Sequence, residues 1–299
     1  MSTIIQTNDG SQYRKPSYLR TQCAITAAMA AQTLPTIALI PLSNSAMYNM
    51  RRASESSNAV TLINAAKKAL DVSGMKQKGV KLFNFNPKES LRPSDIIKDF
   101  SKFIENLCNK PINPKKRLKP FSLLNNYMVR TIRHGYNAGF KPDSNAVYIN
   151  MKKMGLSVFH EIGHSINFNS SKFWRGMQKM RMPLMILASA LPLVAMFKRK
   201  KAEGEESKGF VDKTTTFIKN NVGKLTTLAF VPVVAEEIMA SVRGNAMAKK
   251  LLSAELAKKV AKSNMYGAFT YIALGIFSGV GAYLANKVRD SIAKPQKIN

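Results

Sequence analysis

The chain has 299 residues, which is enough to bury a core in one large domain or two smaller ones. Its formal net charge of +29 favours anionic partners, either nucleic acid or acidic lipid headgroups. No zinc finger, RNP-like aromatic motif or long basic helix accompanies this charge, so the sequence argues against nucleic acid. The two cysteines, Cys23 and Cys108, exclude a disulfide scaffold and a zinc site built from cysteine.

The first 55 residues are predicted to form a basic segment that contains one uncharged stretch. Residues 22–42 carry no charge and are mildly apolar. This stretch barely reaches the ~18–20 residues that a membrane-spanning helix needs. A membrane anchor, a signal peptide and a buried helix therefore remain open interpretations. The polar residues 47–58 are predicted to form a linker.

Helical and strand-like patterns alternate over the following hundred residues. Val60, Ile63, Ala66 and Leu70 recur at helical spacing, which predicts that they share the buried face of one helix. Residues 79–85 alternate between polar and apolar side chains, as in a strand. The predicted elements are a helix over 59–70, a strand over 79–85, a helix over 94–107, a loop over 109–120, a helix over 123–133, a strand over 145–150 and a helix over 155–168.

Three uncharged apolar runs follow, over residues 182–197, 225–235 and 265–286. The first two contain prolines and are short for full membrane spans, so they are predicted to form a helical hairpin around a hydrophilic loop at 198–222. A charged helix over 253–262 precedes the third run, which is long enough to cross a bilayer. Basic residues flank both ends of every run, so the positive-inside rule does not set the orientation.

The pentapeptide from His160 to His164 reads His-Glu-Ile-Gly-His. On a helix the two histidines project from the same face, one turn apart, and can share one tetrahedral Zn²⁺ ion. Glu161 lies about 100° round the helix from His160, where it can reach a water molecule without binding the metal itself. The pattern therefore predicts a zinc-peptidase site in which Glu161 is the general base.

A zinc peptidase of this kind needs a third protein ligand. The one histidine outside the motif, His134, is interpreted as a turn or surface residue, so a downstream carboxylate is favoured. Glu236 and Glu237 directly follow an apolar run, where a carboxylate is costly unless it is paired or bound to metal. The other downstream acids lie in charged stretches typical of solvated surface: Glu203, Glu205, Glu206, Asp212, Glu255 and Asp290.

The order of these features resembles the membrane zinc endopeptidases of the HtpX and CAAX-prenyl-protease type, in which an HExxH helix and an apolar hairpin precede Glu-x-x-Ala-Asp. Here the last motif reads Glu237-Ile-Met-Ala-Ser241, and with Arg243 it is similar to the Glu-x-x-Ala-Ser-x-Arg pattern of the YugP-type peptidases. The resemblance covers about residues 60–250 and implies that Glu237 is the third ligand. Ser241 stands where the better-known families place an acid, so the resemblance does not identify which residues orient the ligands.

We therefore expect a mainly α, α+β chain in which membrane helices accompany a zincin-like catalytic domain with a short edge strand and an active-site helix. The expected divisions are a basic segment with a possible anchor over 1–55, the peptidase domain over 56–262 with its hairpin at about 182–240, and a terminal membrane helix and basic tail over 263–299.

The expected function is hydrolysis of peptide bonds in an extended substrate, at the cytoplasmic face of a membrane to which the chain is attached integrally or peripherally. Membrane lipid is the second expected partner. Two alternatives remain. One is a non-catalytic membrane adaptor on a peptidase-like fold that docks to anionic lipid or nucleic acid. The other is a soluble basic protein whose apolar runs are core helices.

Overall fold

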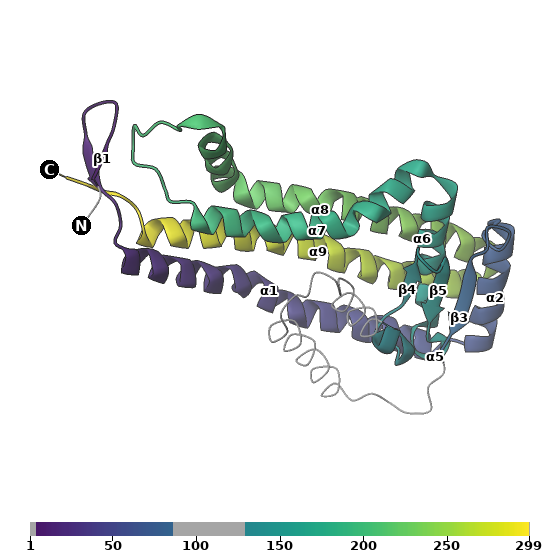
Figure 1. Ribbon diagram of the computed structural model, residues 1–299. Helices are drawn as coiled ribbons and strands as arrows, with labels where there is room; N and C mark the ends of the chain where they lie inside the picture. The colour runs from purple at the N-terminus through teal and green to yellow at the C-terminus, as the bar shows by residue number, and fades with distance from the viewer. Residues whose placement is uncertain (1–3, 86–128, 299) are drawn as a thin grey trace, which may run out of the picture. The chain divides into compact units, whose positions relative to one another are not determined.

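The computed structural model describes residues 4–85 and 129–298 (Figure 1). The helix predicted over 94–107, the loop over 109–120 and most of the helix over 123–133 lie outside these residues. The structure is mostly helical, at 73%, which agrees with the mainly α prediction. Its elements in chain order are β1 (Ile4–Gln6), β2 (Gln12–Arg14), α1 (Tyr18–Glu55), α2 (Ala59–Val72), β3 (Lys81–Asn84), β4 (Gly139–Lys141), β5 (Ala146–Ile149), α5 (Met151–Met154), the 3₁₀ turn η2 (Gly155–Ser157), α6 (Val158–Ser170), α7 (Lys172–Phe197), α8 (Gly209–Leu251), α9 (Ala254–Ile292) and β6 (Gln296–Lys297).

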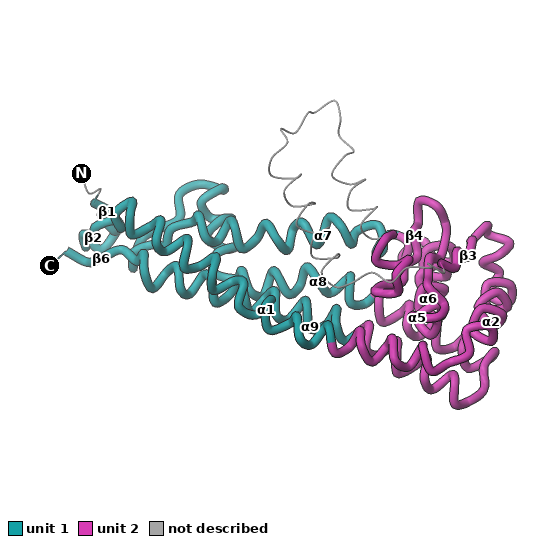
Figure 2. The backbone as a smooth tube through the Cα atoms, turned by 90° about the horizontal axis from the view of Figure 1, so that it is seen from below, with its two compact units in different colours: residues 1–44, 176–235, 269–299 teal, residues 45–175, 236–268 magenta. Residues whose placement is uncertain are grey.

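The chain divides into two compact units, each assembled from segments that are far apart in sequence (Figure 2). Unit 1 comprises residues 1–44, 176–235 and 269–299, and unit 2 comprises residues 45–175 and 236–268. The predicted domains are instead consecutive along the chain, with boundaries after residues 55 and 262, and they stay a prediction.

Unit 1 contains the apolar parts of the four long helices α1, α7, α8 and α9. Among the described residues, these four helices are long and apolar enough to cross a membrane. Between 22% and 44% of each apolar window is buried, so most of its side chains remain exposed. An exposed apolar surface of this extent suits lipid better than water. The structure thus supports membrane association.

Prolines do not interrupt these helices, contrary to the prediction for the apolar runs. Pro35 and Pro41 lie inside α1, Pro183 and Pro192 lie inside α7, and Pro232 lies inside α8. Proline is tolerated in apolar helices because neighbouring helices and local adjustments satisfy the backbone groups that it frees. As a result, each apolar run becomes part of one long helix.

Three other predicted boundaries are also wrong, each because a helix is longer than its sequence pattern indicates. The linker expected at 47–58 is helical as far as Glu55. The hydrophilic loop expected at 198–222 ends where α8 begins at Gly209. The charged helix at 253–262 and the apolar helix at 265–286 are a single helix, α9. In all three cases, the helix continues through polar residues that the apolar pattern does not include.

Small residues allow the helices of unit 1 to pack closely. A Cβ atom at Gly279 would collide with the Thr227 hydroxyl and would lie 2.8 Å from the Gly223 carbonyl oxygen. A Cβ atom at Gly281 would lie 2.8 Å from the Gln32 carbonyl oxygen. The backbone of α9 therefore touches α8 on one side and α1 on another, as expected for helices that associate in lipid.

Unit 1 also holds a buried cluster of charged side chains, which we call the Lys219 cluster: Lys219, Asn286, Arg289 and Asp290. The Lys219 Nζ atom lies 2.7 Å from Asp290 Oδ1 and donates to Asn286 Oδ1 at 2.7 Å. The Arg289 side chain is 1% exposed, and its NH1 atom lies 3.1 Å from Asp290 Oδ1. Every charge in the cluster therefore meets an opposite charge within the unit.

A second feature of unit 1 is a small antiparallel sheet that joins the two ends of the chain. Its strand order is β1-β2-β6, with Tyr13 of β2 opposite Lys297 of β6. Ile5 and Tyr13 face inwards and pack with Ala202 from the loop between α7 and α8. The sequence analysis predicted neither this sheet nor its pairing.

Unit 2 is built around a three-stranded sheet that packs against α2 and α6. Asn58 caps α2 by accepting hydrogen bonds from the backbone N–H groups of Val60 and Thr61. The helix is confirmed, but its predicted apolar face is rotated, because Val60 is 66% exposed and Leu62 is fully buried. The core of the unit joins Leu62 to side chains of the sheet and of α6, including Phe159 and Ile162.

The strand predicted over 145–150 is confirmed as β5, but it is not an edge strand. The sheet order is β3-β5-β4, with β3 parallel and β4 antiparallel to β5. Both sides of β5 are therefore occupied, and no further strand can pair with it. The edges of the sheet are β3 and the short strand β4, Gly139–Lys141.

Candidate metal centre

The site begins with α6, the helix that carries the His-Glu-Ile-Gly-His motif. Its inner face is anchored in the core of unit 2, where Phe159 and Ile162 are fully buried. His160 and His164 lie one turn apart on a neighbouring face, with side chains 12% and 6% exposed. The helix thus holds both imidazoles in a largely water-excluded position, as the motif predicts.

The second element of the site is the part of α8 that lies in unit 2. A Cβ atom at Gly163 would collide with the backbone carbonyl group of Ala240, and one at Gly244 would collide with that of Phe159. One glycine from each helix therefore lets the backbones of α6 and α8 touch. This close approach explains the glycine inside the motif, and it brings Glu236, Glu237 and Ser241 against the two histidines.

Three ligand atoms converge between these helices. His160 Nε2 lies 3.0 Å from Glu237 Oε2 and 3.0 Å from His164 Nε2, and the third side of the triangle, His164 Nε2 to Glu237 Oε2, is 3.5 Å. Zinc bonds of about 2.0–2.1 Å at tetrahedral angles separate two ligand atoms by about 3.3 Å. The three side chains are thus a buried group that can hold a metal ion.

Two further side chains orient the imidazoles. The outer ring nitrogen of His164, Nδ1, lies 2.9 Å from Glu236 Oε1, and that of His160 lies 3.1 Å from the Ser241 hydroxyl oxygen. A carboxylate at Nδ1 keeps the proton on that atom and leaves the Nε2 lone pair for a metal. Ser241 therefore occupies the position of the expected acid and contacts His160 through a neutral hydroxyl group.

Asn167 supports this arrangement from behind. It follows His164 by three residues on α6, and its Nδ2 atom donates to Glu236 Oε1 at 2.9 Å. Both Asn167 and Glu236 are fully buried. The chain of contacts runs from Asn167 through Glu236 to His164, so the carboxylate that orients the histidine is itself held in place.

The two carboxylates change the protonation of His164. Burial alone would lower the pKa of this imidazole, but the negative charges of Glu237 and Glu236 outweigh burial and raise the pKa from 6.5 to about 10. Without a metal ion, a proton therefore compensates the carboxylates at neutral pH. A bound cation would replace that proton, because it brings positive charge to the same atoms.

Glu161 follows His160 on α6 and makes a contact of its own. Its Oε2 atom accepts a hydrogen bond from the backbone N–H of Phe140, at 2.8 Å, and its side chain is buried. Phe140 is the central residue of β4, opposite Val147 of β5. Its N–H therefore points away from β5, towards α6, and holds the Glu161 carboxylate.

The structure brings together three of the four residues that the sequence predicts for the site: His160, His164 and Glu237. The fourth, Glu161, lies on the same helix, and its carboxylate contacts the Phe140 N–H. Glu236 belongs to the site too, as the partner of His164. The residues that sequence reasoning missed are Asn167 and the Phe140 N–H. Helical spacing from His164 could have indicated Asn167, whereas a backbone donor leaves no signal in a side-chain pattern.

The remaining candidate acids lie away from the three ligand atoms, among basic side chains as predicted. Glu205 pairs with Arg199, Asp212 pairs with Lys198 and Lys201, and Glu255 pairs with Lys259. Asp290 does not lie on a solvated surface as predicted, because its side chain is 16% exposed and belongs to the Lys219 cluster of unit 1. His134 lies in a turn, as predicted, but it is buried rather than on the surface.

Arg243, the last residue of the Glu-x-x-Ala-Ser-x-Arg pattern, is half-buried on α8. Its positive charge lies near the Glu236 carboxylate.

Comparison of the whole chain with known proteins found no matching protein family, no matching curated protein and no matching solved structure.

Proposed function

We propose that the protein is a membrane-bound, zinc-dependent endopeptidase of the type that the motif order resembles, the HtpX-, CAAX-prenyl-protease- and YugP-like enzymes. The observation that carries the proposal is the triangle of His160 Nε2, His164 Nε2 and Glu237 Oε2, with sides of 3.0, 3.0 and 3.5 Å. Two imidazoles and one carboxylate are a ligand set of catalytic zinc sites, in which the fourth position stays open.

The residues fit one zinc ion and would use it for hydrolysis. His160, His164 and Glu237 would hold the ion, and Glu236 and Ser241 would orient the imidazoles. When bound, zinc supplies Lewis-acid chemistry that polarises a peptide carbonyl and lowers the pKa of a water molecule towards 7. The buried position of the ligands excludes bulk water and strengthens these electrostatic effects.

Glu161 would be the general base and then the general acid. Its Oε2 atom accepts a hydrogen bond from the Phe140 N–H, which holds the carboxylate in one orientation. It would take a proton from the attacking water and return that proton to the nitrogen of the departing peptide.

The substrate would bind as an extended chain along β4. Among the described residues, β5 is paired on both sides, whereas β4 lies at an edge of the sheet. The edge of β4 that faces away from β5 carries the backbone groups of Phe140, next to Glu161. Addition of a strand there would place the peptide beside the proposed base.

The four apolar helices of the chain support a protein that is integral to the membrane. The apolar part of α8 continues without a break into Glu236 and Glu237. We place the reaction at the cytoplasmic face of the membrane, with membrane lipid as the second partner.

The test compares wild-type protein with Glu161→Gln, both purified in detergent. We expect about one zinc per chain in each by elemental analysis, and cleavage of an unstructured protein such as casein about 10²–10⁴-fold slower in the variant. Glu255→Gln, on an exposed acid of α9, is the matched control and keeps full activity. Unchanged cleavage in Glu161→Gln would contradict the role of this residue. Wild-type protein that binds no zinc would favour the adaptor alternative.

A further inference from the structure

A pocket of about 300 Å³ lies in unit 1, between the start of α8 and the loop that joins α7 to α8. Its lining residues lie at least 17 residues along the chain from the nearest metal ligand, Glu237, and the proposed peptidase reaction does not use the pocket. The residues that line it are Arg199, Lys200, Lys201, Glu205, Ser207, Thr216, Lys219 and Asn220. Four of these side chains are cationic and one is a carboxylate, so the pocket selects for an anion.

The acids near the pocket do not cancel this excess of positive charge. Glu205 is already paired with Arg199, whose NH1 atom donates to Glu205 Oε2 at 2.6 Å. Asp290 pairs with Lys219 at 2.7 Å, and Asp212 pairs with Lys201. Within the described ranges, Lys200 forms no ion pair and is exposed at the rim. The Lys200 ammonium group therefore remains available to an anionic ligand.

The wall of the pocket also offers a polar group. The Thr216 hydroxyl is buried and has no hydrogen-bond partner among the residues that the structure describes. A buried hydroxyl without a partner costs free energy, and a ligand oxygen at this position would relieve the cost. Phosphate oxygens suit such a site, because each accepts hydrogen bonds from hydroxyl, amide and ammonium donors.

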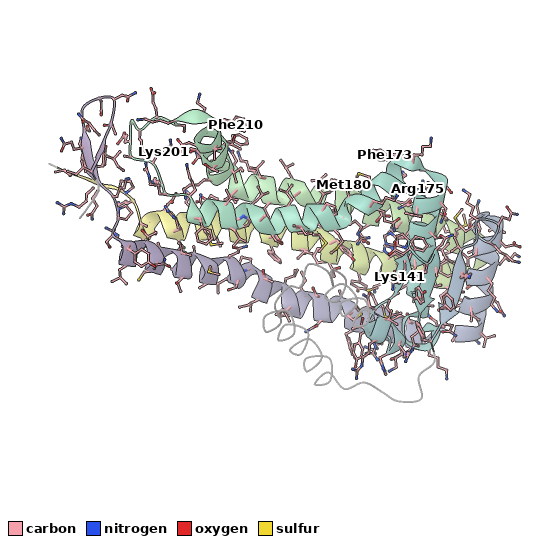
Figure 3. The ribbon with its side chains drawn as sticks, viewed as in Figure 1. Lys141, Phe173, Arg175, Met180, Lys201 and Phe210 are labelled. Carbon is pink, nitrogen blue, oxygen red and sulfur yellow. The ribbon has the colours of Figure 1, made fainter. Side chains whose placement is uncertain are left out.

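Large apolar side chains border the same loop. Phe197 at the end of α7 is 71% exposed, and Phe210 and Val211 at the start of α8 are 83% and 73% exposed. In Figure 3, Lys201 and Phe210 lie near one another at the end of unit 1 that carries this loop. A charged pocket beside exposed aromatic rings matches an amphipathic ligand, with an anionic head and an apolar tail, better than a free anion.

We propose that this pocket binds the phosphate headgroup of an anionic phospholipid. Lys200 and Thr216 contact the phosphate, and Phe197 and Phe210 lie against the acyl chains. The site fixes the ends of α7 and α8 at the level of the headgroups. The proposal is independent of the metal centre and holds whether or not the chain is a peptidase.

The test measures lipid binding to the full-length protein in detergent by native mass spectrometry. Short-chain phosphatidylglycerol is the probe, and phosphatidylcholine of the same chain length is the uncharged comparison. We expect phosphatidylglycerol to bind about tenfold more tightly. Lys200→Gln and Thr216→Val each weaken its binding, the former by about tenfold, because a charge-assisted contact is lost. Lys213→Gln removes the same charge from an exposed position on α8 that does not line the pocket, and it leaves binding unchanged.

Three results would overturn the proposal. One is equal binding of the two lipids. Another is a loss of binding in Lys200→Gln that is no larger than the loss in Lys213→Gln. The third is displacement of phosphatidylglycerol by inorganic phosphate at equal concentration, which would show that the pocket takes the free anion rather than a lipid. Melting temperatures of all variants show that each one folds, and Thr216→Val tests the site without changing its charge.

Discussion

Both units of this chain bury charged side chains, but they satisfy them in opposite ways. In unit 1, Lys219 and Arg289 both pair with Asp290, so each buried charge has a partner of opposite sign within the protein. In unit 2, the lone pairs of His160 and His164 and a carboxylate oxygen of Glu237, which are all acceptors, converge on one point. The first cluster is complete as it stands, whereas the second is completed by a cation, either a proton or a metal ion.

Burial of charge is therefore a weaker indication of function than the chemistry of the groups that meet. A cluster in which every charge is paired, such as the Lys219 cluster, is expected in a bundle of apolar helices, because an unpaired charge there is costly. A convergence of acceptors is costly wherever it is buried, and the fold retains it only if something binds there. Removing one carboxylate from each unit should distinguish a cluster that stabilises the fold from one that binds a cation.

Glu237→Gln should produce the largest effect, on metal binding. Structural zinc sites bind with about 10–16 kcal/mol, so the loss of one of three protein ligands should weaken affinity about a thousandfold. Competition with a chromophoric chelator measures the change. Glu255→Gln, on an exposed acid of the same charge, is the control and should bind zinc like the wild type. An affinity within tenfold of wild type would show that Glu237 is not a ligand.

Asp290→Asn should show the reverse pattern, a loss of stability without a loss of metal. The substitution leaves Lys219 and Arg289 buried without their anion, and breaking a buried pair costs about 3–5 kcal/mol. Thermal unfolding in detergent or in lipid nanodiscs measures the loss, and elemental analysis should still give one zinc per chain. Stability equal to wild type would mean that water or lipid already compensates the cluster.

The contrast also shows what the sequence could predict. The residues of the metal centre lie in two short motifs, and the helical period converts their spacing into geometry. The ligands His160, His164 and Glu237 and the neighbouring Glu236 could therefore be predicted from the sequence. The period of α2 was also clear enough to place the helix, although residues on its exposed side, such as Val60, were assigned to its buried face.

The remaining features depend on pairing between distant parts of the chain. β3 pairs with β5 across more than 60 residues, and β2 pairs with β6 near the opposite end of the chain. Strands of two to four residues carry too little pattern to reveal such partners. The contact between Glu161 and the Phe140 N–H depends on this pairing, because it requires β4 to lie at the edge of the sheet.

Gly163→Ala tests whether the backbone contact between α6 and α8 builds the metal centre. The new methyl group would collide with the Ala240 carbonyl group, and overpacking of this kind costs about 2 kcal/mol. Both the melting temperature and zinc affinity should fall, because the helices must move apart. Gly176→Ala is the matched control in α7, where no heavy atom lies within 4 Å of the new Cβ, and it should raise stability by up to about 1 kcal/mol. Equal effects in the two variants would argue against the close contact.

The pH dependence of metal binding tests the protonation of His164. Its pKa is raised to about 10 in the metal-free protein, so the imidazole carries a proton at neutral pH and zinc must displace it. Affinity should therefore rise about tenfold per pH unit between about pH 5.5 and 7.5. The stability of the metal-free protein depends on pH in the opposite direction to zinc affinity. The raised pKa of His164 stabilises the fold below about pH 6.5, and this contribution is lost as the pH rises towards 10. Calorimetry in two buffers of different ionisation enthalpy should count about one proton released, and a count of zero would contradict the assignment.

Ser241→Ala should give the smallest effect. The hydroxyl group lies 3.1 Å from His160 Nδ1, but it is a neutral acceptor and contributes less than the Glu236 carboxylate does at His164. Loss of an orienting partner costs about 10–100-fold in metal affinity, so Ser241→Ala should fall at the lower end of this range and Glu236→Gln at the upper end. Ser263→Ala removes a buried hydroxyl that has no partner among the described residues, and it should leave zinc affinity unchanged. A larger loss in Ser241→Ala than in Glu236→Gln would mean that His160, not His164, is the imidazole whose orientation limits the site.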